Sequence, residues 1–461
     1  MERRREELVH RYSDLFVECS DKEVQQLYYL LSLFFAKCDG LISSSEVERL
    51  KGDLGAILFD PFQTPAVRRD MILLRMKFLK KYHIENPHEI IRVLTWGFFT
   101  TKRLNLSDRR YLVEFIENPS RTFTWFASRL AVSTSSVFEA YYRLRDRIQF
   151  RFGNILNYPL FKLKHFIVFF KPNEDFEGSI LSREFTLTIN KDTLGEWMWA
   201  SFVVPSQTRT LREFRDGLKS LSYQVFDDHR LYEIRSIGIS CNLSMFDGER
   251  WMPSEDALGV GSFRFAEREE GIVPRLNETM YGDKPIKFDA IDFIISCLRY
   301  GNARERNSGI RSILKQHGYN LSSVTISKRL TSLNRAGVFI PSFGFAGLGL
   351  TASLTFAVEC DDRVVETLYH VFPQFPHCMA SRTDRGAIFM IRAPSESAPA
   401  ISYLIQSSLR DRADRLIVTN RLENIGAAIP ESLYKYWNKD KQYWEFGRGY
   451  FDLTRTPQQK P

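Results

Sequence analysis

The stretch LNLSDRRYLVEFIENPSRTFTWFASRLAVSTSSVFEAYYRLRDRIQF, residues 104–150, predicts three short helices in succession. A polar residue that commonly caps helices stands at the start of each one: Ser107, Thr122 and Ser133. Only a few residues separate the second helix from the third, which is the spacing of a helix-turn-helix. The segment RIQFRFGNILNY (147–158) follows and predicts two short strands that form a wing.

The predicted third helix has two chemically different faces. Its apolar residues recur at helical spacing and would pack against apolar residues of the second helix. The third helix contributes Val137, Tyr141 and Leu144, and the second contributes Phe126, Ala127 and Leu130. The opposite face carries serines, a tyrosine and arginines. Such a face is either solvated or docks onto an anionic partner.

A sandwich of one sheet and two helices is predicted next. The segments follow the order β-α-β-β-α-β, which is that of a ferredoxin-like fold. They are KHFIVFFK (164–171), a helix over 173–184, FTLTINKD (185–192), EWMWASFVVP (196–205), the helix TLREFRDGLKSLS (210–222) and YEIRSIGISCNL (232–243). Trp197 and Trp199 share one face of a strand, so we expect them in the core or in a sheet-pairing surface.

The same order of elements returns near residue 284. Three helices and a wing are predicted in FDAIDFIISCLRYG (288–301), GIRSILKQHG (309–318), SSVTISKRLTSLNRAG (322–337) and GVFIPSFGFAGLGL (337–350), before a second β-α-β-β-α-β series. Ile326, Leu330 and Leu333 repeat the apolar spacing of the first copy 189 residues further on. A turn with a tryptophan follows each copy, FDGERW (246–251) and NKDKQYW (438–444). A duplication in this order is a stronger signal than either copy alone.

We therefore expect an α+β protein of several domains. The predicted segments are an all-helical N-terminal region (1–101), a first winged helix (102–162), a first ferredoxin-like domain (163–242), a loosely packed connector (243–283), a second winged helix (284–350), a second ferredoxin-like domain (351–423) and a C-terminal extension (424–461). Within the N-terminal region, helices are predicted near 23–36, 45–58, 66–82 and 87–99.

Positive charge is concentrated on the two predicted winged helices. The whole chain has a net charge of +8, from 64 basic and 56 acidic residues. Residues 102–165 hold 12 Lys or Arg against 5 Asp or Glu, and residues 284–345 hold 10 against 3. Because each window contributes +7, the rest of the chain is acidic. DNA phosphates supply a physical reason for this segregation through counterion release. Chance clustering is the alternative.

The remaining sequence features argue against a secreted protein, a membrane protein, a metal-binding protein and an enzyme. The start MERRREELVHRYSD lacks the apolar core of a signal peptide, and the longest apolar run, LYYLLSLFFA (27–36), is about half of a membrane span. The six cysteines form no C-x-x-C pair, so we expect reduced thiols in a cytoplasmic protein without membrane contact. His377 and Cys378 are neighbours on a predicted strand and point to opposite faces, which argues against a shared metal. The eight histidines form no catalytic motif, so we expect neither enzyme activity nor a cofactor.

The stretch quoted first resembles the N-terminal winged helix of the Lrp/AsnC (feast/famine) transcription regulators, here in a tandem two-copy form. NRAGVFIPSFGFAGLGL (334–350) is similar to that family's passage from helix to wing to strand. The resemblance covers about 104–242 and 284–423, and it does not cover the first hundred residues. It implies a DNA-binding transcription regulator in which the two sandwich domains pair sheet to sheet within one chain, as a pseudo-dimer.

The resemblance also implies that the outward face of each third helix contacts double-stranded DNA. The first copy offers Thr134, Ser135, Ser136, Tyr142, Arg143 and Arg147, and the second copy offers Ser323, Thr325, Lys328, Arg329 and Thr331. Glu139 would meet phosphate repulsion there, although a carboxylate can accept from a cytosine amine. The alternative is that the hydroxyls cap the helices and the arginines only solvate the surface. We expect His317 to be a satisfied, partly buried side chain rather than a metal ligand.

Several partners and functions stay open at this stage. The family's effector loop corresponds to SRTDRGA (381–387), with Asp384 and Ala387 at the places of interest, and no ligand contact is assigned to it. A small-molecule effector between the sandwiches, a homo-oligomer through their sheets and a protein partner at the N-terminal region are each compatible with the sequence. Two other functions fit the same order of elements: a tetrapyrrole-binding enzyme of the sirohaem decarboxylase type, and an interaction scaffold with degenerate winged helices.

Overall fold

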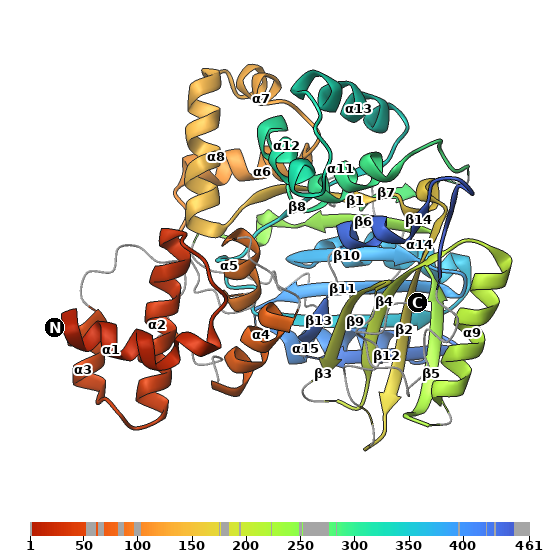
Figure 1. The fold of residues 1–461 in the computed structure, drawn as a ribbon. Helices are drawn as coiled ribbons and strands as arrows, with labels where there is room; N and C mark the ends of the chain where they lie inside the picture. Colours follow the sequence, from red (N-terminus) through yellow and green to blue (C-terminus); the bar gives the residue numbers. More distant parts are fainter. Residues whose placement is uncertain are drawn as a thin grey trace.

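The chain is an α+β protein in which a helical N-terminal region precedes antiparallel sheets (Figure 1). The computed structural model describes residues 2–51, 61–62, 69–81, 87–95, 103–174, 176, 184–192, 195–222, 224–248, 251, 276–282, 284–394, 397–420, 422–427 and 430–446. We call residues 103–241 unit one and residues 284–427 unit two.

The N-terminal region is helical over its described residues, as predicted. Its helices are α1 (Glu2–Tyr12), α2 (Lys22–Cys38), α3 (Ser44–Lys51), α4 (Arg69–Lys81) and α5 (Pro87–Thr95). Asp21 caps α2 by accepting from the N–H groups of Glu23 and Val24. The apolar run 27–36 is the buried centre of α2 and belongs to a core of its own. Across the described residues, we find no helix long and apolar enough to cross a membrane.

Unit one begins with three helices, α6 (Leu106–Glu117), α7 (Phe123–Leu130) and α8 (Thr134–Ile148). Thr122 and Ser133 cap α7 and α8, as predicted, whereas Asn105 rather than Ser107 caps α6. The Asn105 side chain accepts from the N–H of Asp108 at 2.7 Å. The predicted apolar residues of α7 and α8 are buried together in one cluster.

Unit two begins with an equivalent set, α11 (Ala290–Gly301), α12 (Asn307–Gln316) and α13 (Ser323–Arg335). Asp289 and Asp292 form a reciprocal capping box at the start of α11, and Ser322 caps α13. Three apolar residues of α13 are buried as the duplication predicts: Ile326, Leu330 and Leu333.

The prediction of a two-stranded wing in each unit is wrong. Each unit has one strand at this place, β1 (Arg151–Leu156) in unit one and β8 (Phe339–Gly344) in unit two. The two strands pair antiparallel with each other, from Arg151 opposite Gly344 to Leu156 opposite Phe339. Each strand obtains its partner from the other unit, so the pair joins the two three-helix sets.

The first sheet is built from β2 (Leu163–Pro172), β3 (Thr186–Asp192), β4 (Met198–Pro205) and β5 (Phe226–Glu233), with α9 (Thr208–Ser222) between β4 and β5. In space its strands run β3-β4-β2-β5. The second sheet repeats the order as β10-β11-β9-β12. Its elements are β9 (Ala352–Glu359), α14 (Asp362–Val371), β10 (His377–Arg382), β11 (Gly386–Ala393), α15 (Ala398–Leu409) and β12 (Arg415–Asn420). Most of the helix predicted over 173–184 lies outside the described residues.

Each unit also lends one strand to the other unit's sheet. Strand β6 (Ser236–Cys241) of unit one pairs with β10, and β13 (Leu422–Ala427) of unit two pairs with β3. The segment 232–243, predicted as one strand, is therefore the end of β5 followed by β6. The predicted domain boundary at 423 is also wrong, because it falls inside β13.

The two sheets face each other across a shared apolar core (Figure 1). Ile167, Phe169 and Trp199 of the first sheet pack with residues of the second in one cluster. The residues of the second sheet are Ala357, Ile388 and Ile417. Trp199 and Trp197 thus lie in the sheet-pairing surface, as predicted.

The segments after each unit cross over in the same way. Trp251 donates its indole N–H to the carbonyl of Leu348 in unit two at 2.5 Å, and Trp444 donates to Phe161 in unit one at 2.6 Å. Trp444 lies in a short strand pair, β14 (Trp437–Asn438) with β15 (Tyr443–Trp444), after the 3₁₀ helix η6 (Pro430–Tyr436). The described parts of the connector are also packed rather than loose, since β7 (Asn277–Met280) pairs with β6 and Tyr281 is buried.

Candidate nucleic-acid interface

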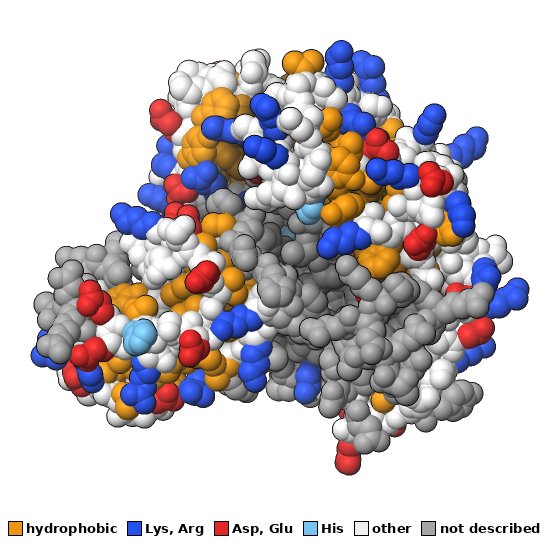
Figure 2. Space-filling view, viewed as in Figure 1, with side chains coloured by type: hydrophobic (Ala, Val, Ile, Leu, Met, Phe, Trp, Pro, Cys, Tyr) orange, Lys and Arg blue, Asp and Glu red, His pale blue; other side chains and the backbone are white. Residues whose placement is uncertain are grey.

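Both third helices, α8 and α13, lie at the same end of the molecule, above the two sheets (Figure 1). Each buries one face in its own unit and exposes the other. Lys and Arg side chains project from this end of the molecule (Figure 2). The outward faces of these two helices are the candidate interface.

The outward face of α13 presents hydroxyl groups and an exposed lysine. Ser323, Lys328 and Thr331 are exposed, and Thr325 is half-buried. The Thr325 hydroxyl lies 2.9 Å from the capping hydroxyl of Ser322, and the Thr331 hydroxyl donates to the carbonyl of Ser327. Thr325 therefore extends the cap, while Ser323 and Lys328 point into solvent at the N-terminal half of the helix, which favours anions.

The segment that contains α12 and α13 carries cations but no carboxylate. The sequence from 306 to 358 holds no Asp or Glu. Its exposed cations are Arg306, Arg311, Lys315, Lys328 and Arg335, which lie on or beside α12 and α13. Charge of one sign on adjoining helices creates a positive potential that attracts a polyanion.

Arg329, which the sequence suggested as a DNA contact, forms ion pairs within the protein. Its Nη2 lies 3.0 Å from Asp289 Oδ2 and its Nη1 lies 2.6 Å from Asp292 Oδ1. Burial lowers the pKa of Arg329, but hydrogen bonds to the two aspartates outweigh it and raise the pKa overall. The arginine therefore fastens the third helix to the start of the first, which corrects its assignment as a DNA contact.

Unit one uses the equivalent aspartate in the same way. Asp108 is fully buried at the third position of α6, where Asp292 stands in α11. It accepts from Nε and Nη2 of Arg143, and from Nη1 of Arg147 at 3.2 Å. Both arginines predicted to contact DNA are thus held by one buried carboxylate, and their positive charge is partly neutralised.

Besides these paired arginines, the exposed surface of α8 carries aromatic, hydroxyl and further charged side chains. Phe138 is 40% exposed and Tyr142 is 37% exposed. The Arg145 guanidinium stacks on the Tyr142 ring, 4.7 Å from its centroid, and pairs with Asp146. Glu139 is exposed on the same face. The three hydroxyl residues predicted at the start of α8 are placed as expected for capping. The Ser135 and Ser136 hydroxyls lie 2.7 and 2.8 Å from the hydroxyl of the cap residue Ser133, and Thr134 is half-buried.

Arg304 holds the two three-helix sets against each other. It belongs to the loop between α11 and α12 of unit two, yet its guanidinium lies over the rings of Phe123 and Phe152 in unit one. It also donates to the carbonyl of Arg121. The sequence analysis missed this residue, because a lone arginine in a loop carries no signal that it contacts aromatic rings far away in the chain.

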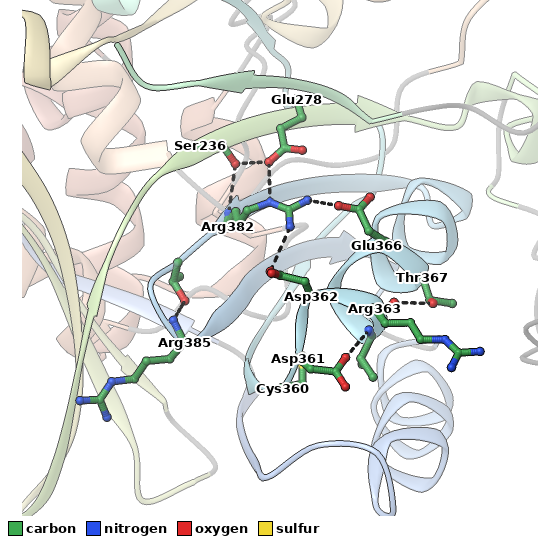
Figure 3. A network of polar contacts seen from close by, with 12 residues as sticks. Ser236, Glu278, Cys360, Asp361, Asp362, Arg363, Glu366, Thr367, Arg382 and Arg385 are labelled. Carbon is green, nitrogen blue, oxygen red and sulfur yellow. Dashed lines mark hydrogen bonds and ion pairs between the residues drawn. The ribbon is translucent and has the colours of Figure 1, made fainter. Parts of the chain in front are cut away.

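Side chains of the loop 381–387, which the sequence predicted to correspond to the family's effector loop, bind other residues of this protein. Asp384 accepts from the N–H of Glu233 at 2.9 Å, which ties unit two to the end of β5. The guanidinium of Arg382 pairs with Glu278, Asp362 and Glu366 (Figure 3). Ala387 is buried. These side chains join β7, β10 and α14, so their arrangement serves the packing of unit two.

Two of the described histidines, His165 and His377, are buried. His165 lies between Tyr281 and Ser201, with its ring nitrogens 3.1 and 2.8 Å from their hydroxyls, and burial lowers its pKa to about 4. His377 packs against two phenylalanines near the partly buried Arg392, and burial, followed by that guanidinium, lowers the pKa of His377 to about 3. His317 contacts the Tyr434 hydroxyl at 3.3 Å, as a partly buried histidine should. Within the described ranges, no group of three or more His, Cys, Asp or Glu side chains could hold a metal.

Comparisons with solved structures give remote similarities. The crystal structure of the siroheme decarboxylase NirDL is similar to this chain with a TM-score of 0.43 and 12% identity, over 71% of this chain and 97% of that one. The same enzyme in complex with an iron-uroporphyrin III analogue gives a TM-score of 0.41 and 10% identity, over 68% and 91%. The crystal structure of PH0061 gives 0.21 and 13%, over 29% and 94%. Likenesses this distant do not establish a shared function. No model of a protein family and no curated protein matches the sequence.

Proposed function

We propose that the protein is a DNA-binding transcription regulator. In this proposal each unit combines a variant winged helix, whose single wing strand pairs with that of the other unit, with a ferredoxin-like domain, and the two units form a pseudo-dimer within one chain. The observation that carries the proposal is that α8 and α13 both turn an exposed face outward at one end of the molecule, with exposed cations around α13 and no carboxylate between 306 and 358.

Duplex DNA fits these two faces for physical reasons. A third helix of a helix-turn-helix enters the major groove with its N-terminal residues against base edges. The Ser323 hydroxyl and the Lys328 ammonium lie in that half of α13. Cations on α12 and at the end of α13 would contact the phosphates that flank the groove. The protein would act by occupying a promoter, without chemistry of its own.

The proposal is tested by the salt dependence of binding to duplex DNA. We expect the logarithm of the binding constant to fall linearly with the logarithm of salt concentration, with a slope of about −0.9 per phosphate contacted. Lys328→Ala combined with Arg335→Ala should weaken binding and make the slope shallower by about 2. Arg329 is left intact because it holds the helix in place.

The matched control removes two cations far from the interface. Arg212 and Arg215 are exposed on α9, at the side of the first sheet. Arg212→Ala with Arg215→Ala changes the net charge equally and should leave affinity and slope unchanged. Binding that is absent, insensitive to salt or reduced equally by both double variants would exclude the proposal. A Soret band on addition of haem would instead favour the tetrapyrrole-binding alternative.

A further inference from the structure

We infer that the two units recognise chemically different half-sites, so that the preferred DNA sequence is not a palindrome. The inference rests on the proposed DNA binding and adds the character of the site. A homodimer presents the same helix twice, and its operator is accordingly pseudo-palindromic. In this chain the two outward helices come from diverged copies, and their exposed side chains belong to different chemical classes.

The α13 face is suited to donate hydrogen bonds. Lys328 is exposed, with Ser323 and Thr331 exposed beside it, and no carboxylate occurs in α12, α13 or the turn between them. A lysine donor in the major groove matches the two acceptors of guanine, N7 and O6. The half-site under unit two should therefore contain guanine, and flanking cations should add contacts to its phosphates.

The α8 face is suited to apolar contact and to accepting a hydrogen bond. Phe138 and Tyr142 are the large hydrophobic side chains that it exposes, and Glu139 stands next to Phe138. Of its three arginines, Arg143 and Arg147 are bound to the buried Asp108 and Arg145 is paired with Asp146, so each has a carboxylate partner. In the major groove an aromatic side chain packs on the thymine methyl group, and a carboxylate accepts from the cytosine amine. The half-site under unit one should therefore be rich in thymine and cytosine contacts.

The order and spacing of the two half-sites should be fixed. The units are joined by the β1–β8 pair and by Arg304, which reaches from unit two onto Phe123 and Phe152 of unit one. A rigid connection between two reading helices restricts them to one geometry on the duplex. A site with one half inverted would present the wrong chemistry to one of the two helices.

The experiment is selection of duplexes from a random library by the full-length protein, repeated with variants. The wild type should select one asymmetric sequence, in which the half-site beneath α13 is read through guanine and the half-site beneath α8 through thymine and cytosine. Lys328→Ala should relax the half beneath α13, with discrimination at its guanine falling about tenfold, and leave the other half unchanged. Glu139→Gln and Phe138→Ala should relax only the other half. Glu139→Gln keeps the size of the side chain, so it reports on recognition even if Phe138→Ala perturbs folding.

The outcomes separate the two ideas. A palindromic selected sequence, or relaxation of both halves by Lys328→Ala, overturns the inference while leaving DNA binding intact. Selection of no sequence above background, together with no salt-dependent binding, overturns the proposed function and the inference with it. An asymmetric sequence in which each variant relaxes its own half supports both.

Discussion

At the scale of single residues, one aspartate per unit, buried in unit one and partly buried in unit two, determines how many arginines remain for a ligand. Asp108 and Asp292 occupy the third position of the first helix in their units, and each binds an arginine of the third helix. A buried carboxylate without a cation would be costly, so these arginines are required for folding. The cations that remain for DNA include those on α12 and α13.

Replacing Asp108 with Asn should destabilise unit one by about 1–3 kcal/mol. The change removes the carboxylate that holds Arg143 and Arg147, although both arginines are about half exposed and can be rehydrated. Urea-induced unfolding measures the loss. Asp146→Asn is the control, because that aspartate is exposed and pairs only with Arg145 on the surface. Equal, small effects of both substitutions would contradict the structural role of Asp108.

Stability should also depend on pH through His165. Burial lowers its pKa to about 4 in the folded protein, from an ordinary value of about 6.5 in the unfolded chain. Between these values the unfolded chain binds the extra proton, so stability falls as pH falls through this window, by on the order of 3 kcal/mol in total. His165→Gln removes this titration. The free energy of unfolding, measured from pH 7 to 4, should fall less steeply in the variant, and parallel curves would argue against the assignment.

Some of these residues could be predicted from sequence and some could not. The apolar residues of both third helices were predicted correctly, because helical spacing depends only on local order. The pairing of Arg143 with Asp108, 35 positions earlier in the chain, depends on how α6 and α8 cross. The only local signal for this pairing was an aspartate near the start of the first helix in both copies. That aspartate has a simpler explanation, because acidic residues stabilise helix N-termini without any arginine partner. The sequence therefore assigned three structural arginines to DNA.

At the scale of elements, the strands that cross between units determine the architecture. Strands β6 and β13 each complete the other unit's sheet, and β1 pairs with β8. The sequence correctly predicted strands within 147–158 and 232–243, because strand propensity is local, but not their number: the first segment holds only β1, and the second holds the end of β5 followed by β6. It could not predict their partners, since a wing hairpin and a pair formed between units use the same short apolar segment. The two predicted wings were wrong for this reason.

Ile239→Pro tests the exchanged strand β6. Ile239 lies between Met379 of β10 and Asn277 of β7. Because β6 has a paired strand on both sides, the Ile239 N–H points toward a neighbouring strand whichever side it takes. Proline there should cost about 3 kcal/mol or more. The control is Met280→Pro in the edge strand β7. The neighbouring Tyr281 N–H donates to the carbonyl of Arg235, so the Met280 N–H points to the other side, away from β6. Thermal unfolding should show a large loss for Ile239→Pro only, and equal losses would contradict the proposed position of β6.

At the scale of the whole molecule, the exchanged strands join both units into one folding unit. Neither sheet has its full set of strands without the other unit, and the faces of both sheets share one apolar core. Hydrogen exchange should therefore show the central strands β2 and β9 opening with the same free energy. The N-terminal helices have a core of their own and should open separately. A lower opening free energy for one sheet alone would show that the units fold independently.

The most direct test of DNA binding is a hydroxyl-radical footprint of the full-length protein on a duplex that it selects. We predict two protected segments on the same face of the duplex, one beneath each third helix, with different sequences. Lys328→Ala with Arg335→Ala should first weaken protection of the segment beneath α13. Protection of a single segment would show that only one unit contacts DNA, and absence of protection at low salt would contradict the account.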